Sequence, residues 1–311
     1  MKAFIMNNNL LSSLMDQIKI VKDRIRGVVH GMYTGMYLFG RPGTSKSHIV
    51  RSTLDALAIN HKYSNGHLTS IGLFELLQDN HDRVIVIDDI SSLFSEPVAL
   101  QILLAALGNS YDKSNTRWVN YKTAKGDVKI PFTGGIIAIS NTSLRGNHKE
   151  VLGALKDRIY TIHYEPSNDQ VIALIEDIAS GGVKGINSVN CKTVCRFLIK
   201  ECQVRSIRPS VRLFVDKALP DYSQWAAGLT ETHWQDLIRS ELEQQLVELQ
   251  HPTTDLGRTE QIDAERRIAY DIYLHFDSLS ERIKQWATRT GKSQAAYYRR
   301  IKELQSMGEI K

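Results

Sequence analysis

A glycine-rich segment at residues 40–47 constrains this chain more than any other part of its sequence. It reads Gly-Arg-Pro-Gly-Thr-Ser-Lys-Ser, follows a short apolar run and precedes a stretch with helical spacing. In such a strand–loop–helix unit the glycines let backbone N–H groups point at phosphate oxygens. The N-terminus of the helix adds the positive end of its dipole. The sequence therefore predicts an α/β fold with a phosphate-binding loop.

Lys46 and Ser47 close this loop and carry its chemistry. We expect the Lys46 ammonium to reach the β- and γ-phosphates of ATP, and the Ser47 hydroxyl to bind Mg²⁺. Ser45 stands where the usual loop pattern has a glycine; we expect it to take helical backbone angles and its side chain to narrow the loop. The residues expected to hold ATP are Gly40, Pro42, Gly43, Thr44, Ser45, Lys46 and Ser47.

Two acids close the apolar run at residues 83–88: Asp88 is its last residue, and Asp89 follows directly. A continuous apolar run closed by acids is typical of a buried parallel strand. If this strand lies beside the loop strand, Asp88 comes close to the metal and binds Mg²⁺ through water. Asp89 then orients and deprotonates the attacking water. The alternative is that the two acids simply begin a loop, but the phosphate loop upstream favours a catalytic site.

Predicted strands alternate with predicted helices up to about residue 165, which indicates a parallel sheet covered by helices on both faces. After residue 166 the pattern becomes entirely helical. We expect a nucleotide-binding core over 1–165, a helical region over 166–222, a helical connector over 223–257 and a small helical module over 258–311.

These motifs together resemble the AAA+ ATPase family over roughly residues 25–220. The sequence GRPGTSKS looks like its Walker A loop, and VIVIDD looks like its Walker B strand. The family usually has Asp-Glu where this chain has Asp88 and Asp89, so the expected base is one methylene shorter and hydrolysis is expected to be slow. The resemblance implies an AAA+ parallel sheet with flanking helices, a helical lid over 166–222, and ATP and Mg²⁺ as cofactors.

Two further segments are similar to the sensor elements of that family. The apolar run at residues 136–140 leads into Asn141, as in the sensor-1 strand, which implies that Asn141 holds the attacking water or the γ-phosphate. The segment Arg-Pro-Ser-Val-Arg at 208–212 resembles sensor 2. Arg212 would then contact the γ-phosphate from the same chain, with Arg208 as the alternative.

The segment Leu-Lys-Asp-Arg at residues 155–158 resembles the part of AAA+ proteins that carries the arginine finger. By that resemblance Arg158 reaches the ATP of a neighbouring subunit, with Arg145 and Lys156 as alternatives. A finger acting between subunits requires a homo-oligomer, and the family most often forms hexameric rings. The expected catalytic residues are thus Asp89, Asn141, Arg158 and Arg212.

The alternating stretch at residues 117–132 predicts a β-hairpin. It resembles the hairpin that precedes sensor 1 in ring helicases and initiators, which implies that Lys122 and Lys125 contact DNA phosphates, with Lys125 at the tip. Trp118 and Tyr121 are interleaved with these cations. The alternative is an edge hairpin that its lysines protect from aggregation.

The C-terminal module predicts two helices, at residues 279–287 and 294–304, separated by a turn that contains Gly291. Ser293 is a good N-cap for the second helix. The pattern resembles a helix-turn-helix, in a winged-helix variant, whose second helix meets base edges. The alternative is a packing or oligomerisation module. The expected DNA contacts are Lys292, Gln294, Tyr297, Arg299 and Arg300.

Charge and cysteine content add weaker constraints. The net charge of +5 fits a nucleic-acid partner without requiring one. Cys191, Cys195 and Cys202 fall on nearly one helical face among apolar residues, so we expect them in the core rather than at a metal. The absence of a disulfide framework favours a reducing, cytoplasmic setting. No stretch is long and apolar enough to span a bilayer, so we expect no membrane association.

The leading hypothesis is an oligomeric ATPase that remodels DNA, in the manner of a helicase, initiator or helicase loader, in replication or mobile-element maintenance. One alternative is a DNA-bound ATP switch or transcriptional regulator that assembles without translocating. Another is an AAA+ chaperone that remodels proteins.

Overall fold

The computed structural model describes residues 2–89, 93–94, 96–108, 116–123, 126–144, 149–250, 258–307 and 309–310. The chain forms two compact units. The first unit comprises Met1–Cys195 and Pro209–Leu219, and the second comprises Arg196–Arg208 and Pro220–Lys311. Among the described residues, no helix is long and apolar enough to cross a membrane. The four-domain division expected from the sequence stays a prediction.

The first unit is built on a parallel sheet, as the alternating pattern predicts. Its five described strands lie in the order β2-β3-β6-β1-β7, and every pairing is parallel. Strands β1 and β6, both in the interior of the sheet, are apolar and almost entirely buried, as expected for a parallel sheet covered on both faces. The strands are β1 (Gly35–Phe39), β2 (His61–Asn65), β3 (Val84–Asp88), β6 (Ile136–Ser140) and β7 (Tyr160–His163).

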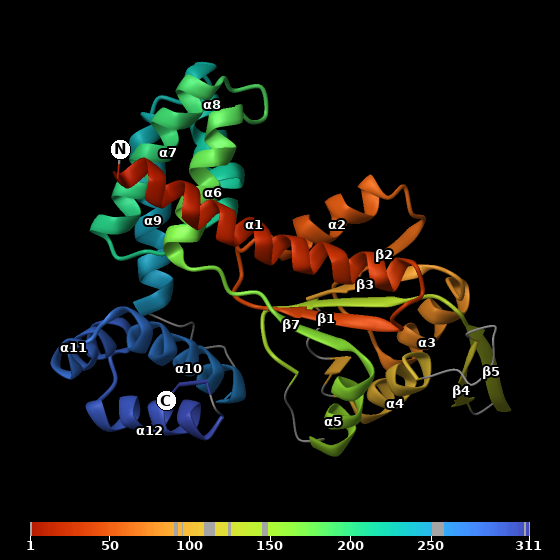
Figure 1. Cartoon of the computed structure of the whole chain (residues 1–311). Helices are drawn as coiled ribbons and strands as arrows, with labels where there is room; N and C mark the ends of the chain where they lie inside the picture. Colours follow the sequence, from red (N-terminus) through yellow and green to blue (C-terminus); the bar gives the residue numbers. More distant parts are fainter. Residues whose placement is uncertain are drawn as a thin grey trace. The chain divides into compact units, whose positions relative to one another are not determined.

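Helices cover both faces of this sheet (Figure 1). Helices α1 (Lys2–Val29) and α2 (Lys46–Ala56) pack on one face, where Leu14, Ile25 and Leu54 are fully buried. The opposite face carries α3 (Ser70–Asp79), α4 (Pro97–Ala106) and α5 (Lys149–Arg158). The first unit also contains α6 (Asn168–Gly181), which contacts α1. The predicted α/β architecture is therefore confirmed.

The strand order corrects one expectation. We expected the strand that ends in Asp88 to lie beside the loop strand, but β6 lies between β3 and β1. Because all three strands are parallel, their carboxyl ends still meet at one edge of the sheet. The phosphate loop, the two acids and Asn141 therefore lie along the same edge. Asn141, which directly follows β6, lies between the loop and the acids.

The predicted hairpin is also present. Strands β4 (Arg117–Thr123) and β5 (Gly126–Phe132) pair in antiparallel register, with Trp118 opposite Pro131 and Lys122 opposite Asp127. One face of the hairpin packs on α3 and α4 through Val119, Ile130 and Phe132. The hairpin is thus attached to the core by one apolar face.

The second unit is helical throughout its described part. It holds the C-terminal portion of α7 (Ser188–Val204), most of α8 (Leu219–Ala226) and the four helices that follow. Its C-terminal module has a separate core centred on Trp286 and Tyr297. The remaining helices are α9 (Trp234–Gln250), α10 (Arg258–His275), α11 (Leu279–Thr290) and α12 (Gln294–Ser306).

Cys191, Cys195 and Cys202 lie in α7; all three thiols are buried, as predicted, and none of them forms a disulfide. Burial raises the pKa of the Cys202 thiol to about 12. Its burial places this thiol in the core.

Candidate nucleotide-binding site

Both glycines of the loop after β1 occupy places where a side chain does not fit. A Cβ at Gly40 would lie 1.9 Å from the carbonyl oxygen of Tyr164. Gly43 has a φ of +78°, and a Cβ there would lie 2.8 Å from the Cβ of Ser210. The Thr44 hydroxyl closes the turn by donating to the carbonyl oxygen of Arg41 at 2.9 Å. The loop therefore requires glycine at these two positions for reasons of space as well as of conformation.

Ser45 does not adopt the helical angles that we expected. Its φ is 68° and its ψ is 19°, the left-handed conformation, although it directly precedes α2 as the N-cap. Its side chain makes no capping hydrogen bond. Glycine is the usual residue here because it reaches this conformation without a Cβ penalty. The chain therefore keeps the loop geometry of the motif while carrying the strain of a serine.

Lys46 is the centre of the site. Its side chain is buried, and its ammonium donates to the carbonyl oxygens of Gly40 and Arg41 at 2.7 and 2.6 Å and to Asn141 Oδ1 at 3.1 Å. Burial lowers the pKa of Lys46 to about 8, against the opposing effect of the carboxylates of Asp89 and Asp88. A buried cation held by a loop of backbone groups is a ready partner for phosphate oxygens.

Asn141 links this cation to the acid. Its amide oxygen accepts from Lys46, while its Nδ2 donates to both carboxylate oxygens of Asp89 at 3.0 and 3.1 Å. Asp89 itself has a φ of 57°, and its backbone N–H donates to the carbonyl oxygen of Ile139 in β6. The structure thus brings together three residues with predicted roles: Lys46 for the phosphates of ATP, Asn141 for the attacking water and Asp89 as the base.

Asp88 and Ser47 meet at a residue that the sequence analysis missed. The Tyr63 hydroxyl, from β2, donates to Asp88 Oδ2. Burial raises the pKa of Tyr63, and its contacts with Asp88 and with the Ser47 hydroxyl act on it as well. The oxygens of Ser47 and Asp88 therefore both approach the Tyr63 hydroxyl. Hydroxyl and carboxylate oxygens suit Mg²⁺. Tyr63 reaches Asp88 because β2 pairs with β3, and the local sequence pattern gives no sign of that pairing.

The described residues contain no cluster of three His, Cys, Asp or Glu side chains able to hold a metal ion. Proteins commonly bind Mg²⁺ through one or two protein oxygens together with substrate phosphates. Ser47 and Asp88 fit that role.

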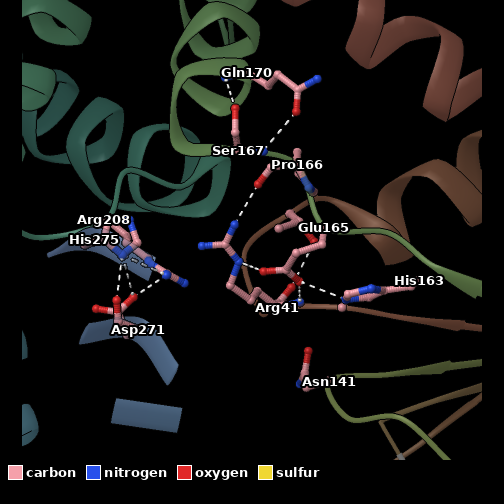
Figure 2. A network of polar contacts seen from close by, with 12 residues as sticks. Arg41, Asn141, His163, Glu165, Pro166, Ser167, Gln170, Arg208, Asp271 and His275 are labelled. Atoms are coloured by element: carbon pink, nitrogen blue, oxygen red, sulfur yellow. Dashed lines mark hydrogen bonds and ion pairs between the residues drawn. The ribbon is translucent and has the colours of Figure 1, made fainter. Parts of the chain in front are cut away.

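Arg41 fastens the loop to the segment that follows β7 (Figure 2). Its backbone N–H donates to Glu165 Oε2 at 3.0 Å, its guanidinium forms an ion pair with the same carboxylate, and Nη2 donates to the carbonyl oxygen of Pro166 at 2.7 Å. His163 Nε2 lies 3.6 Å from Glu165 Oε2, and the His163 ring stacks on Phe39. The sequence analysis missed this anchor because its partners are more than 120 residues apart.

Arg212 lies close enough to the site for its charge to lower the pKa of Lys46, as one of the smaller influences on that group. It precedes a π-helical turn, Leu213–Ala218, a form that often occurs at functional sites. The alternative, Arg208, belongs to the second unit and is paired there with Asp271 (Figure 2). This placement favours Arg212 as the sensor-2 residue, a role that stays a prediction.

Arg158 lies at the opposite edge of the sheet. It is the last residue of α5, and β7 begins two residues later at Tyr160. Its carbonyl oxygen accepts from Thr34, just before β1, so the length of β1 separates it from the loop by about 17 Å. Its exposed guanidinium donates to the carbonyl oxygen of Leu104. The Arg158 side chain therefore lies too far away to reach the phosphate-binding loop of its own chain.

Burial contradicts two of the expected DNA contacts in the C-terminal module. Tyr297 is 1% exposed and packs against Trp286 in the module's core, so its assignment to base edges is wrong. Arg300 is buried and pairs with Glu265 and Glu303, so it is a structural residue. Both side chains face the other helices of the module: Tyr297 packs on Trp286 of α11, and Arg300 pairs with Glu265 of α10.

The remaining expected contacts are exposed. Lys292 is half exposed and pairs with Glu265, while Gln294 and Arg299 lie on the open face of α12. Tyr298, which the sequence analysis passed over, is 43% exposed and accepts a hydrogen bond from Gln294 at 3.3 Å. The open face of α12 consists of Gln294, Ala295, Tyr298, Arg299 and Lys302.

The hairpin residues also divide into buried side chains that stabilise the fold and exposed side chains that a ligand could reach. Arg117 is buried, donates to the carbonyl oxygens of Phe132 and Gly134, and has its pKa lowered to about 10 by burial, so it stabilises the hairpin. Tyr121 stacks on Phe74 of α3. Lys122 is exposed, as a DNA contact requires. Lys125, the expected tip, lies outside the described residues, as does Arg145.

Comparisons with known proteins identify relatives of this chain. No family model matches it. A protein of Enterobacteria phage T4, described as an uncharacterized 36.7 kDa protein in the nrdC-mobD intergenic region, is 30% identical over 172 residues. The match covers 49% of this chain and 51% of the phage protein, so the chain spans about half the length of this relative.

Solved structures of similar fold include the Aeropyrum pernix ORC2 protein in its ADP form and a mutant of Thermotoga maritima RuvB. The first is 15% identical with a TM-score of 0.46 and covers 94% of this chain and 85% of that one. The second is 15% identical with a TM-score of 0.43 and covers 97% and 88%. These likenesses concern the fold alone.

Proposed function

We propose that this chain is an AAA+ ATPase that binds and hydrolyses ATP and acts on DNA as an oligomer. The observation that carries the proposal is the continuous polar connection Lys46–Asn141–Asp89 at the carboxyl edge of the sheet. It joins a phosphate-binding loop to a carboxylate through one amide. That is the combination that phosphoryl transfer to water requires, because positioning and charge stabilisation supply most of its catalysis.

Each residue then has a defined task. On ATP binding the Lys46 ammonium exchanges the loop carbonyls for the β- and γ-phosphate oxygens. Ser47 and Asp88 would hold Mg²⁺, which would neutralise charge on the phosphates. Asn141 holds the attacking water, and Asp89 accepts its proton. Because the Asp89 carboxylate is short and already engaged by Asn141, we expect slow hydrolysis in the chain alone.

The position of Arg158 supports assembly. An exposed arginine at the edge opposite the phosphate loop can complete the site of an adjacent copy but not its own. We infer a homo-oligomer arranged head to tail, and a hexameric ring as its closed form. Within each chain Arg212 would contact the γ-phosphate.

The test is the ATP hydrolysis rate with and without single- and double-stranded DNA. We expect DNA to stimulate hydrolysis by the wild-type protein and Lys46→Ala to remove hydrolysis under both conditions. A rate that DNA leaves unchanged, in a protein that binds ATP, would remove DNA from the proposal.

Two other functions remain distinguishable from this one. A DNA-bound ATP switch would hydrolyse ATP without separating strands, whereas a motor displaces a strand and loses that activity in Lys125→Ala. An AAA+ chaperone would lack salt-sensitive DNA binding. We place the motor first because the hairpin presents exposed cations in addition to those of α12.

A further inference from the structure

The face of the β4–β5 hairpin that points away from the core presents a tryptophan to solvent. Trp118 is 51% exposed, although a side chain of this size is normally well covered in a folded domain. The strand register places Trp118, Asn120 and Lys122 of β4 on one face together with Asp127, Lys129 and Pro131 of β5. All six residues are exposed, whereas their neighbours Val119 and Ile130 are buried in the core. We call these six residues the outer hairpin face.

Cations accompany the exposed ring. The Lys129 ammonium lies 4.7 Å from the centre of the Trp118 ring, a cation–π contact, and Lys122 lies on the same face two residues from Asn120. One carboxylate, Asp127, stands opposite Lys122, so the face carries a small positive excess. It combines a flat aromatic surface with ammonium groups within one strand length.

This combination has a defined chemical match. Single-stranded nucleic acids offer unpaired bases that stack on aromatic rings and phosphates that pair with lysines, and such stacking tolerates any base sequence. A duplex keeps its bases stacked on one another, so it offers phosphates to the lysines but no face to the indole. An acidic protein would pair with the lysines and leave the ring without a planar partner.

We propose that the outer hairpin face binds one single strand of nucleic acid, with a base stacked on Trp118 and its phosphates at Lys122 and Lys129. The inference rests on the proposed function and deepens it, because it names single strands as the substrate of the hairpin. It also separates two aromatic residues that look equivalent in the sequence: Trp118 is available, while Tyr121 is held against Phe74.

The test uses the full chain with ATP and measures the affinity for a labelled deoxythymidine oligomer, the matching uridine oligomer and a duplex of equal length. We expect Trp118→Ala to weaken oligomer binding by about tenfold, because a base–aromatic stack contributes on that order, and to leave duplex affinity unchanged. Trp118→Phe should restore most of the loss, since it retains a ring. The two oligomers show whether DNA, RNA or both are accepted.

Trp225→Ala is the matched control, since Trp225 is 36% exposed and lies in the second unit. An equal loss for oligomer and duplex in Trp118→Ala, or no loss for either, overturns the inference. A change in oligomeric state with unchanged affinity would instead make this face a contact between copies of the chain, which also overturns it. DNA-stimulated hydrolysis that persists in Trp118→Ala with normal oligomer binding would refute the inference and leave the proposed function standing.

Discussion

Lys46 is a cation buried in the phosphate-binding loop. Because burial lowers its pKa to about 8, it is protonated at pH 7 and largely neutral at pH 9. Bound phosphates stabilise the protonated form and raise this pKa, so binding takes up a proton once the pH exceeds about 8. ATP affinity should therefore fall as pH rises.

We expect a non-hydrolysable ATP analogue to bind about tenfold more weakly at pH 9 than at pH 7, at saturating Mg²⁺. Calorimetry in two buffers of different ionisation enthalpy should detect the proton uptake at pH 9. Equal affinity at both pH values, with no proton uptake, would contradict the role assigned to Lys46.

Ser45 carries the strain of a left-handed backbone without a compensating cap. Replacing it by glycine should raise the free energy of unfolding by about 1 kcal/mol and leave ATP affinity intact, because the loop geometry is unchanged. Chemical denaturation measures this. The matched control is Ser52→Gly inside α2, which should lower stability by about 0.5–1 kcal/mol. If Ser45→Gly were as destabilising as Ser52→Gly, the left-handed assignment would be wrong.

At the scale of elements, α12 offers two adjacent arginines with opposite expected effects. Arg299→Ala, on the open face, should weaken duplex binding and reduce its salt dependence by about one phosphate contact, with unchanged stability. Arg300→Ala removes a buried partner of Glu265 and Glu303 and should destabilise the protein by about 3 kcal/mol. Binding isotherms at several salt concentrations and thermal unfolding separate the two. Equal effects of both variants on DNA affinity alone would refute this orientation of α12.

Arg158, the last residue of α5, can act only if the chain assembles with other copies. Arg158→Ala should reduce hydrolysis about a thousandfold while keeping ATP binding, whereas Lys156→Ala, nearby on the same helix, should retain activity. Mixing Arg158→Ala with Lys46→Ala should restore hydrolysis, since one variant supplies an intact ATP site and the other an intact arginine. A mixture as inactive as its components would exclude a finger that acts between subunits.

Local pattern predicted much of this molecule. The loop, the strand ending in Asp88 and the hairpin each follow from residues close in sequence, and each is found where expected. Long-range pairing could not be predicted in the same way. The insertion of β6 between β1 and β3, the Tyr63 contact with Asp88 and the Arg41–Glu165 anchor depend on the order of strands, which no single periodicity encodes.

The C-terminal module shows a second limit. Tyr297 and Tyr298 are neighbours of the same type, and the rotation of one helix decides which is core and which is surface. That rotation is set by Trp286 and by the ion pairs of Glu265, which lie on other helices. Composition could place aromatic and basic residues in α12 but could not assign its faces.

At the scale of the whole molecule, every proposed activity requires that the loop at residues 40–47 be an ATP site whose cation is Lys46. Calorimetric titration of the purified chain with a non-hydrolysable ATP analogue, with and without Mg²⁺, tests it directly. The account predicts one site per chain, tighter binding with Mg²⁺, and loss of binding in Lys46→Ala at an unchanged fold. Absence of binding by the wild-type chain, or equal binding by Lys46→Ala, would contradict it.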